Sequence, residues 1–427
     1  MGTAALEALS VLRRYTINCD SICCARGGSS AISPCRLASV LNSICGSICA
    51  CSNCSCACNA CFSTAAVRAF SFSCSACSSA SLDWFQKKIP ANKLIKVEDT
   101  FEALESLAEY KRQNSTAHFI GVTGSVGKTS TKEIIGLILS SFGKTFVSRG
   151  NFNNHIGVPI NLASIADDVE FAVIEMGMNK AGEISLLTKQ VTPDIAVITS
   201  VAPVHLEFFD SIEKIADAKS EIFEGLDINT GIAILNRDIS TYRRCIENID
   251  RAGIGNIKTF GKSQFANIRF VSYSLIDQNM VKLTYSIFHE KIEFVMPAVP
   301  KHIAINFAAA LAVVYCLGLD INQAVKVLAQ FKPQMGRGLF VDIKKEDKEY
   351  SIITDYYNAS PESLKAGLEY LHQFKNPKKS AILGDMKELG KDELKFHFAA
   401  IPHIVKSGVK KLFLVGDIMP QLAQEIP

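Results

Sequence analysis

The sequence predicts an α/β protein in which a central P-loop-type domain, built on a mostly parallel sheet, is followed by a smaller Rossmann-like α/β domain. Short apolar runs alternate with helical patterns from about residue 93 onward, which is typical of parallel sheets with helices on both faces. A glycine-rich stretch at residues 121–130 joins an apolar run to a helical pattern, as a phosphate-binding loop does. Residues 1–92 lack this alternation, and we expect an anomalous low-complexity segment there.

Three regions are therefore expected: a Cys- and Ser-rich segment at 1–92, a central domain at 93–318 and a C-terminal α/β domain at 319–427, which we expect to be truncated. The 427 residues suffice for about two to four domains. The net charge of +3 gives no case for nucleic acid or an anionic membrane as the main partner. We expect no membrane span, because no run of about twenty apolar residues occurs.

The cysteines are concentrated near the start of the chain. Thirteen of the 15 lie between Cys19 and Cys77, and only Cys245 and Cys316 follow. The larger part therefore has the composition of a reduced protein, and we expect a cytoplasmic monomer. Between Cys45 and Cys61 the C-x-C and C-x-x-C spacings could bind zinc or copper, but no histidine accompanies them. We expect no packed fold at residues 1–82, and read them as a replacement for a normal domain.

The elements follow in order from residue 93. A short strand precedes a helix at 100–112, with Thr100 as its N-cap. Period-two alternation between residues 256 and 296 predicts an antiparallel addition to the sheet, and the helix at 301–317 is apolar nearly all round and so predicted to be buried. The other expected strands are 144–147, 171–176, 195–199, 232–235, 350–354, 380–383 and 411–415, and the other helices are 181–189, 211–225, 321–331, 361–372 and one after residue 391.

The glycine-rich loop predicts a nucleotide site. Glycines let the backbone wrap phosphate oxygens, and the N–H groups that open the following helix favour an anion. Lys128 would reach the outer phosphates and the Thr129 hydroxyl would bind Mg²⁺. Val122 stands where the general pattern has its first glycine, so a glycine-rich turn with a surface lysine is the alternative. The expected nucleotide-binding residues of the loop are Gly124, Ser125, Val126, Gly127, Lys128, Thr129 and Ser130.

Further candidates follow other strands. Glu175 ends an apolar strand, at the edge where parallel sheets bind ligands, and is a candidate Mg²⁺ ligand. His205 and Glu207 follow the next strand, although a histidine there is as often a satisfied surface residue. Lys219 lies on a polar helix, where a solvated lysine is the ordinary interpretation.

A polar loop at residues 151–159 contains a cluster of amides. Such a loop could bind a sugar, a peptide or a phosphate, or could cap the next helix. Asn151, Asn153 and Asn154 are the candidate substrate-binding residues in it.

Together these residues resemble the ATP-dependent Mur ligase family of peptidoglycan synthesis, from about residue 93 to the end of the chain. The loop T-G-S-V-G-K-T-S has that family's form, which also lacks the first glycine. The resemblance implies that Thr129 and Glu175 bind one Mg²⁺ and His205 a second. It implies that Lys219 is carbamylated by CO₂, and it makes Lys128, Lys219 and His205 catalytic.

Three later stretches extend the resemblance. Asn306 matches the second asparagine of the family's H-N-x-x-N, which contacts adenine, although Ile303 stands at the first. Arg337 matches an arginine that reaches the nucleotide phosphates, and Asp355 a residue that binds the ribose. Residues 355–361 and 383–390 look like the motifs D-S-Y-N-A-N-P and G-D-M-x-E-L-G of the branch that adds D-alanyl-D-alanine.

The implied reaction is ATP-driven amide formation. Its implied partners are UDP-N-acetylmuramoyl-tripeptide and D-Ala-D-Ala, with ATP and two Mg²⁺ ions. Nothing in residues 1–82 resembles the family's UDP-binding domain, and its Lys-Gly-Ser stretch beyond the last strand is missing. Three alternatives therefore stay open: another Mur or folylpolyglutamate-type ligase, a non-catalytic ATP-binding remnant, and a Cys-rich metal-binding protein.

Overall fold

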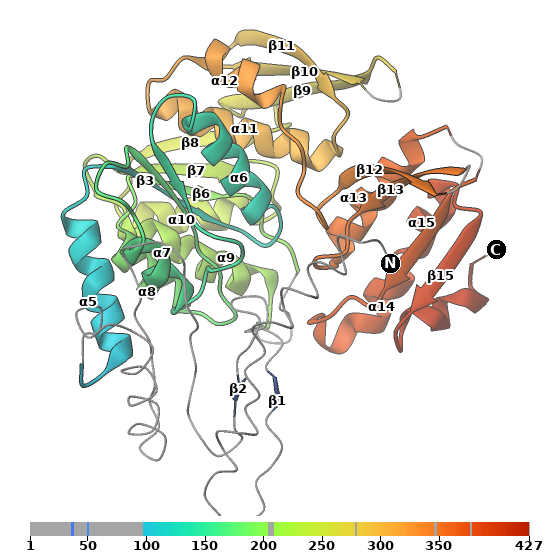
Figure 1. The fold of residues 1–427 in the computed structure, drawn as a ribbon, viewed down its shortest axis with the longest axis horizontal. Coiled ribbons are helices and arrows are strands. Elements are labelled where there is room, and N and C mark those ends of the chain that lie inside the picture. Colours follow the sequence, from blue (N-terminus) through green and yellow to red (C-terminus); the bar gives the residue numbers. More distant parts are fainter. Residues whose placement is uncertain are drawn as a thin grey trace, which may run out of the picture. The chain divides into compact units, whose positions relative to one another are not determined.

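The computed structural model describes residues 36–37, 49–50, 97–203, 209–277, 280–345, 348–375 and 378–426 (Figure 1). Most of the predicted Cys- and Ser-rich segment lies outside these residues, as do the short strand expected before residue 97 and the candidates His205 and Glu207. Within the segment, β1 (Arg36–Leu37) pairs antiparallel with β2 (Cys49–Ala50).

Contacts between Cα atoms divide the chain into two compact units: residues 1–113 with 162–164, and residues 114–161 with 165–427. The first contains helix α5 (Thr100–Gln113). Asp99 caps this helix, because its Oδ1 accepts hydrogen bonds from the N–H groups of Phe101 (2.7 Å) and Glu102 (2.9 Å). The prediction of Thr100 as the N-cap is therefore wrong by one residue.

The second unit is built on a nine-stranded sheet with the order β11-β10-β9-β8-β7-β6-β3-β5-β4. Strands β3 to β8 all run parallel to their neighbours among these six strands. Strands β5 and β6 are buried along their whole length, and β3 is buried except at His118, which confirms the mostly parallel α/β class predicted from the sequence. The strands are β3 (His118–Thr123), β4 (Thr145–Val147), β5 (Phe171–Glu175), β6 (Ile195–Ile198), β7 (Ile232–Asn236), β8 (Asn256–Gly261), β9 (Ile268–Leu275), β10 (Met280–Ile287) and β11 (Glu290–Pro297).

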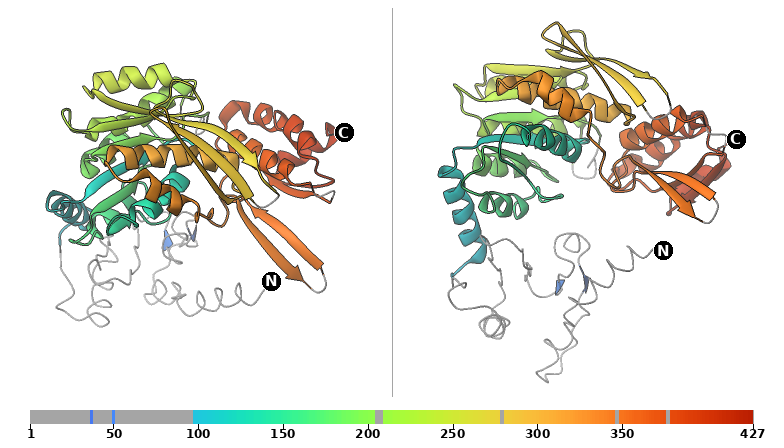
Figure 2. Two further views of the ribbon diagram at one scale, coloured as in Figure 1. Left: turned by 90° about the horizontal axis from the view of Figure 1, so that it is seen from above. Right: turned by 45° about the horizontal axis from the view of Figure 1, so that its top comes forward.

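Helices cover both faces of this sheet (Figures 1 and 2). One layer contains α6 (Lys128–Leu139), α11 (Lys301–Cys316) and α12 (Ile321–Leu328), with α11 packed on β7, β8 and β9. The burial predicted for α11 is confirmed, because its residues from Phe307 to Val314 are all buried. The opposite layer contains α8 (Glu183–Val191), which contacts β3, with α9 (Ile212–Ser220) and α10 (Tyr242–Arg251).

The antiparallel addition begins later than predicted. Strand β8 pairs parallel with β7, and β9 starts parallel to β8, so only β9, β10 and β11 are antiparallel. Helix α10, which the sequence reading did not include, provides the crossover that lets β8 run parallel. Period-two alternation identifies a half-exposed strand but carries no information on the direction of its partner.

The chain from residue 339 onward forms two small sheets. Strand β12 (Leu339–Lys345), which was not predicted, pairs antiparallel with β13 (Lys348–Thr354), and β14 (Ser380–Gly384) pairs parallel with β15 (Lys411–Val415). Helices α13 (Pro361–Gln373) and α15 (Ile401–Ser407) contact each other beside them. The remaining helices are α7 (Gly157–Ala163), η2 (Glu221–Gly225), η3 (Gly390–Asp392), α14 (Glu393–Phe398) and η4 (Met419–Gln424).

Among the described residues, no helix combines the length and apolar character that crossing a membrane requires.

Candidate functional site

A cavity of about 450 Å³ lies where the parallel strands end. Its lining takes Ser125 from the loop after β3, Glu175 from the end of β5, Thr199 from the loop after β6 and Asn236 from the end of β7. This edge, where β3 lies between β5 and β6, is the usual ligand-binding edge of such sheets. The predicted residues that line the cavity are Ser125, Val126, Gly127, Lys128, Thr129, Ser130, Asn151, Asn153, Glu175, Asn306, Arg337 and Asp355.

Three of the predicted site residues do not line it. Gly124, Asn154 and Lys219 lie outside the lining, and His205 lies outside the described residues. Gly124 nevertheless shapes the loop. A Cβ atom there would lie 2.0 Å from Thr199 Oγ1, with φ at +151°, so glycine is required for the loop to approach β6.

The loop and the start of α6 form an anion site. Gly127 precedes α6 with a φ of 88° and has no side chain to cap it. The N–H groups of Lys128, Thr129 and Ser130 have no acceptor within the helix because they lie in its first turn. These groups, together with the helix dipole, favour phosphate. Lys128 Nζ donates to Gly124 O at 2.8 Å and so lies folded over the loop.

The loop after β6 holds the phosphate loop in place. Ser200 accepts hydrogen bonds from the N–H groups of Ser125, at its carbonyl oxygen (2.9 Å), and of Val126, at its hydroxyl (2.8 Å). Thr199 Oγ1 donates to Val126 O at 2.7 Å. Sequence reasoning missed both residues. The sequence feature that could have identified them is a Thr–Ser pair directly after an apolar strand that ends at the same sheet edge.

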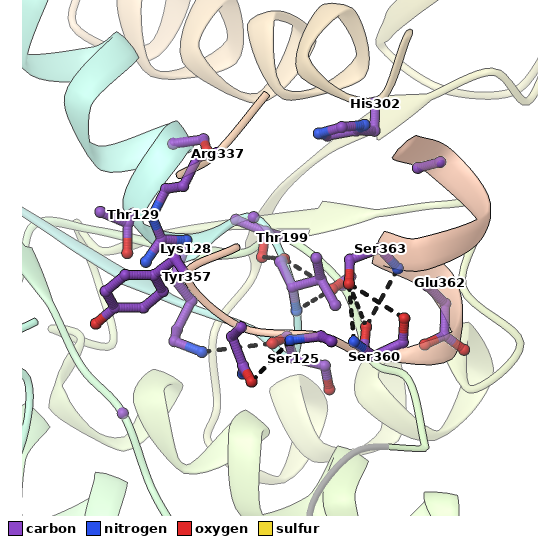
Figure 3. A pocket seen from close by; sticks show the side chains of 18 of the residues that line it. Ser125, Lys128, Thr129, Thr199, His302, Arg337, Tyr357, Ser360, Glu362 and Ser363 are labelled. Carbon is purple, nitrogen blue, oxygen red and sulfur yellow. Dashed lines mark hydrogen bonds between the residues drawn. The ribbon is translucent and has the colours of Figure 1, made fainter. Parts of the chain in front are cut away.

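Lys128 and Arg337 place positive charge in the cavity (Figure 3). Burial lowers the pKa of Lys128, Glu175 opposes that shift, and Arg337 adds to it. The Arg337 guanidinium carbon lies 4.1 Å from the centre of the Tyr357 ring, which orients the guanidinium by a cation–π contact. Two cations held this way suit a polyanionic ligand such as a nucleotide phosphate chain.

Glu175 is buried, with 2% of its surface exposed. Its Oε1 accepts a hydrogen bond from Asn153 Nδ2 at 2.7 Å, whereas Oε2 has no hydrogen-bond partner among the described residues. A buried carboxylate oxygen with no hydrogen-bond donor among the described residues, in a cavity that Thr129 also lines, suits a hard cation. Thr129 and Glu175 thus fit the Mg²⁺ role that the sequence suggested.

Among the described side chains, no three His, Cys, Asp or Glu residues cluster as a metal cage. A site with one carboxylate and a hydroxyl from the protein is compatible with Mg²⁺, which usually keeps several waters and binds substrate phosphates.

Lys219 is buried in α9, with 2% of its surface exposed, so the ordinary interpretation of a solvated lysine is wrong. Burial lowers the pKa of Lys219 well below its usual value, and the charge of Lys128 lowers it further. Both effects shift the equilibrium of this side chain toward the neutral amine, which is the nucleophilic form.

The three asparagines of the amide loop at residues 151–159 differ in position. Asn151 and Asn153 line the cavity. Asn154 instead caps α7, because its Oδ1 accepts hydrogen bonds from the N–H groups of Ile156 (3.2 Å) and Gly157 (2.8 Å). The capping alternative therefore applies to Asn154, and substrate contact stays a prediction for Asn151 and Asn153.

The lining of the cavity also includes His302, Asn306 and Asp355. Burial lowers the pKa of His302 to about 4, and its Nδ1 has no hydrogen-bond partner among the described residues. The Asn306 amide lies so near the phosphate loop that a Cβ on Gly127 would be 3.2 Å away. Desolvation raises the pKa of Asp355 to about 6 and Arg337 opposes that shift.

Comparison with known proteins gives two domain families. Residues 122–314 match the Mur ligase middle domain, and residues 341–427 match the Mur ligase, glutamate ligase domain. A UDP-N-acetylmuramoyl-tripeptide–D-alanyl-D-alanine ligase of Rickettsia prowazekii is 43% identical over 336 residues, which cover 79% of this chain and 74% of the relative. The Bacillus subtilis protein of the same name is 34% identical over 332 residues, covering 78% and 70%.

The solved structures that resemble this chain include ligases of the same name. A crystal structure of MurF from Acinetobacter baumannii superposes with a TM-score of 0.69 at 30% identity, covering 76% of this chain and 69% of that one. MurF from Thermotoga maritima in complex with ADP superposes with a TM-score of 0.65 at 29% identity, covering 79% of each chain. A folylpolyglutamate synthase of Mycobacterium tuberculosis shares the fold at 16% identity, with a TM-score of 0.56 over 76% of this chain and 88% of that one.

Proposed function

The chain belongs to the Mur ligase family, and from this premise we propose that it joins D-Ala-D-Ala to UDP-N-acetylmuramoyl-tripeptide in an ATP-dependent reaction of peptidoglycan precursor synthesis. One observation carries the proposal: the phosphate loop, Arg337 and Asp355 line a single cavity although more than 200 residues separate them in the sequence. The identity to the Rickettsia ligase favours this member of the family over folylpolyglutamate-type ligases, whose likeness is one of fold alone.

ATP would bind with its phosphates at the start of α6. Lys128 and Arg337 neutralise phosphate charge, and the N–H groups of the first helical turn bind phosphate oxygens. We propose that Asn306 contacts the adenine and that the Asp355 carboxylate accepts hydrogen bonds from the ribose hydroxyls. The positions of both side chains in the lining of the same cavity support these assignments.

We propose that Thr129 and Glu175 hold Mg²⁺, with His205 and a carbamate on Lys219 as further ligands. Bound Mg²⁺ supplies charge neutralisation of the phosphates. The Oε2 of Glu175, which has no hydrogen-bond partner among the described residues, supports the first pair. For Lys219, the buried neutral amine can attack CO₂: a nitrogen–carbon bond forms, the nitrogen loses one proton, and a carboxylate-like group results. A protein-bound ¹³C carbamate signal after incubation with ¹³C-bicarbonate, absent in Lys219→Arg, checks this assignment.

The reaction proceeds in two steps. The terminal carboxylate of the tripeptide attacks the γ-phosphorus of ATP, the bond to the β-phosphate oxygen breaks, and an acyl phosphate and ADP form. The amine of D-Ala-D-Ala then attacks the acyl carbon, the nitrogen loses a proton, and phosphate leaves. This chain contributes positioning and charge: Lys128 and Arg337 stabilise negative charge that spreads over the transferred phosphoryl group.

A reducing, cytoplasmic location is part of the proposal. Cys245 and Cys316 are free thiols, as expected for a protein of a reducing compartment.

The decisive experiment measures phosphate release with each substrate alone and with both. We expect ATP turnover only when tripeptide precursor and D-Ala-D-Ala are both present. Lys128→Ala should lower turnover at least about a thousandfold, because a phosphoryl-transfer charge is removed. The matched control is Lys144→Ala, since Lys144 is exposed and pairs with exposed Asp168.

Other results of this experiment would assign a different function to the chain. Turnover supported by a different amine substrate would assign another ligase of the superfamily. Phosphate release that no precursor stimulates would identify a non-catalytic nucleotide-binding protein. Full activity in Lys128→Ala would overturn the site assignment.

A further inference from the structure

Lys132 is a buried cation directly behind the candidate metal site. It lies on α6, one helical turn after Lys128, and its side chain is fully buried. Its Nζ donates to Ser148 O (2.6 Å) and Gly150 O (2.9 Å), in the stretch that leads from β4 to the amide loop. The same atom lies 3.2 Å from Glu133 Oε1 and 3.8 Å from Glu175 Oε2. A lysine is almost never buried in this way without partners that compensate its charge. The four oxygen atoms around Lys132 Nζ are these partners.

Glu175 is held from several sides. Its backbone N–H donates to Ser148 Oγ at 3.0 Å, and its Oε1 accepts from Asn153 Nδ2 at 2.7 Å. Its Oε2 faces the Lys132 charge at 3.8 Å but accepts no hydrogen bond from any described residue. One carboxylate oxygen is thus fixed by an amide, and the other has no hydrogen-bond donor among the described residues.

Asn153 is itself fixed by the end of β5. Its carbonyl oxygen accepts a hydrogen bond from Gly177 N at 2.8 Å. Gly177 has to lack a side chain here, because a Cβ atom would lie 2.8 Å from Asn153 Cγ. The amide therefore reaches Glu175 from a rigid position rather than from a free loop.

We propose that Lys132 and Asn153 are positioning residues that hold the Glu175 carboxylate in the orientation that binds Mg²⁺ with the nucleotide. Lys132 does so through charge and by fixing Ser148, whose hydroxyl binds the Glu175 backbone. Asn153 does so through its amide. This assignment rests on the proposed function for the metal, and it gives Asn153 a role toward Glu175 in place of the substrate contact expected from the sequence.

A second effect of Lys132 has the opposite sign. A positive charge 3.8 Å from Oε2 also repels a cation bound there. If repulsion dominates, removing the charge tightens Mg²⁺ binding. If positioning dominates, removing it weakens Mg²⁺ binding. The sign of the change therefore decides between the two.

The test is calorimetric titration of the full chain with ADP, with and without Mg²⁺, and without either peptide substrate. The measured quantity is the factor by which Mg²⁺ tightens ADP binding. We expect Lys132→Met and Asn153→Ala each to reduce that factor by about tenfold or more, as is typical when a partner of a metal ligand is removed. ADP binding without Mg²⁺ should change little.

Two matched controls separate positioning from general damage. Asn154→Ala removes the neighbouring amide, which caps α7, and should lower the melting temperature without changing the Mg²⁺ factor. Lys144→Met makes the same substitution at an exposed lysine. Lys132→Arg keeps the charge and should restore part of the Mg²⁺ factor that Lys132→Met loses.

If Lys132→Met does not fold, Asn153→Ala alone decides, since its side chain is partly exposed. The proposal is overturned if Mg²⁺ tightens ADP binding in Asn153→Ala or Lys132→Met as much as in the wild type, or more. It is also overturned if Mg²⁺ does not change the ADP affinity of the wild-type chain. Because no peptide substrate is present, failure of the ligase activity with a normal Mg²⁺ factor would count against the proposed function and leave this inference standing.

Discussion

His302 illustrates how the environment of one residue makes stability depend on pH. Burial lowers the pKa of its imidazole from 6.5 to about 4 in the folded chain. Between these values the unfolded chain binds a proton that the folded chain does not. The contribution of His302 to stability is therefore complete above pH 6.5 and is lost as the pH falls toward 4.

We predict that His302→Gln flattens this part of the stability profile. Urea denaturation at about pH 7 and about pH 4.5 should show the free energy of unfolding falling by roughly 2–3 kcal/mol more in the wild type than in the variant. Equal losses in both proteins would mean that His302 is protonated in the folded state at the lower pH.

Residue patterns and the family resemblance placed most of the predicted site residues correctly in the cavity lining, but they did not show what each side chain contacts. The pattern around Lys219 favoured solvation, whereas the fold buries it. The three asparagines at 151–154 looked equivalent, yet Asn153 binds Glu175 and Asn154 caps a helix. These differences depend on side-chain direction relative to β5 and α7, which local sequence does not encode.

At the scale of elements, Asp385 joins the ends of β14 and β15. Its carboxylate is 4% exposed and accepts hydrogen bonds from the N–H groups of Asp417 (2.8 Å), Ile418 (3.2 Å) and Met419 (2.8 Å). Gly416 lacks a side chain because a Cβ atom there would lie 2.3 Å from Asp385 Cγ. A two-stranded parallel sheet has little stability of its own, so this connection is important.

We predict that Asp385→Ala lowers the free energy of unfolding by about 2–4 kcal/mol, because three backbone donors lose their acceptor. Lys387→Ala is the matched control. Lys387 is 73% exposed and only 3.6 Å from Asp385, so removing it should cost less than about 0.5 kcal/mol. Chemical denaturation of the two variants measures both values, and similar losses would show that the ion pair rather than the backbone contacts matters.

Elements with a strong hydrophobic periodicity were predicted near their observed bounds. Several elements that pack beside them, and the direction of one strand, were not predicted correctly. The buried helix α11 and the parallel strands around the phosphate loop were expected almost at their observed bounds. Strand β12 and helix α10 were missed, and the direction of β8 was wrong. Strand direction is set by the crossover that precedes the strand, which is a property of two elements rather than one.

At the scale of the whole molecule, the described residues that line the candidate nucleotide cavity lie between Ser125 and Leu389. Because none of these described lining residues belongs to the Cys- and Ser-rich segment, we predict that deleting residues 1–92 changes ADP affinity by no more than about twofold. Titration of the full and shortened chains with ADP in the presence of Mg²⁺ measures this. A larger loss would place part of the nucleotide site in the Cys-rich segment.

The sequence by itself predicted the α/β class, the phosphate loop and the candidate Glu175, because glycine spacing and hydrophobic periodicity are local properties that a single chain displays. Arg337 and Asp355 became candidates through the resemblance of their motifs to the Mur ligase family. The tertiary structure decided which of these residues share a cavity, and it added Thr199, Ser200 and Lys132 to the site. It also decided that Lys219 is buried and that one oxygen of Glu175 has no hydrogen-bond donor among the described residues. Burial and the pairing of polar groups arise only when distant segments meet, so no local pattern could have supplied them.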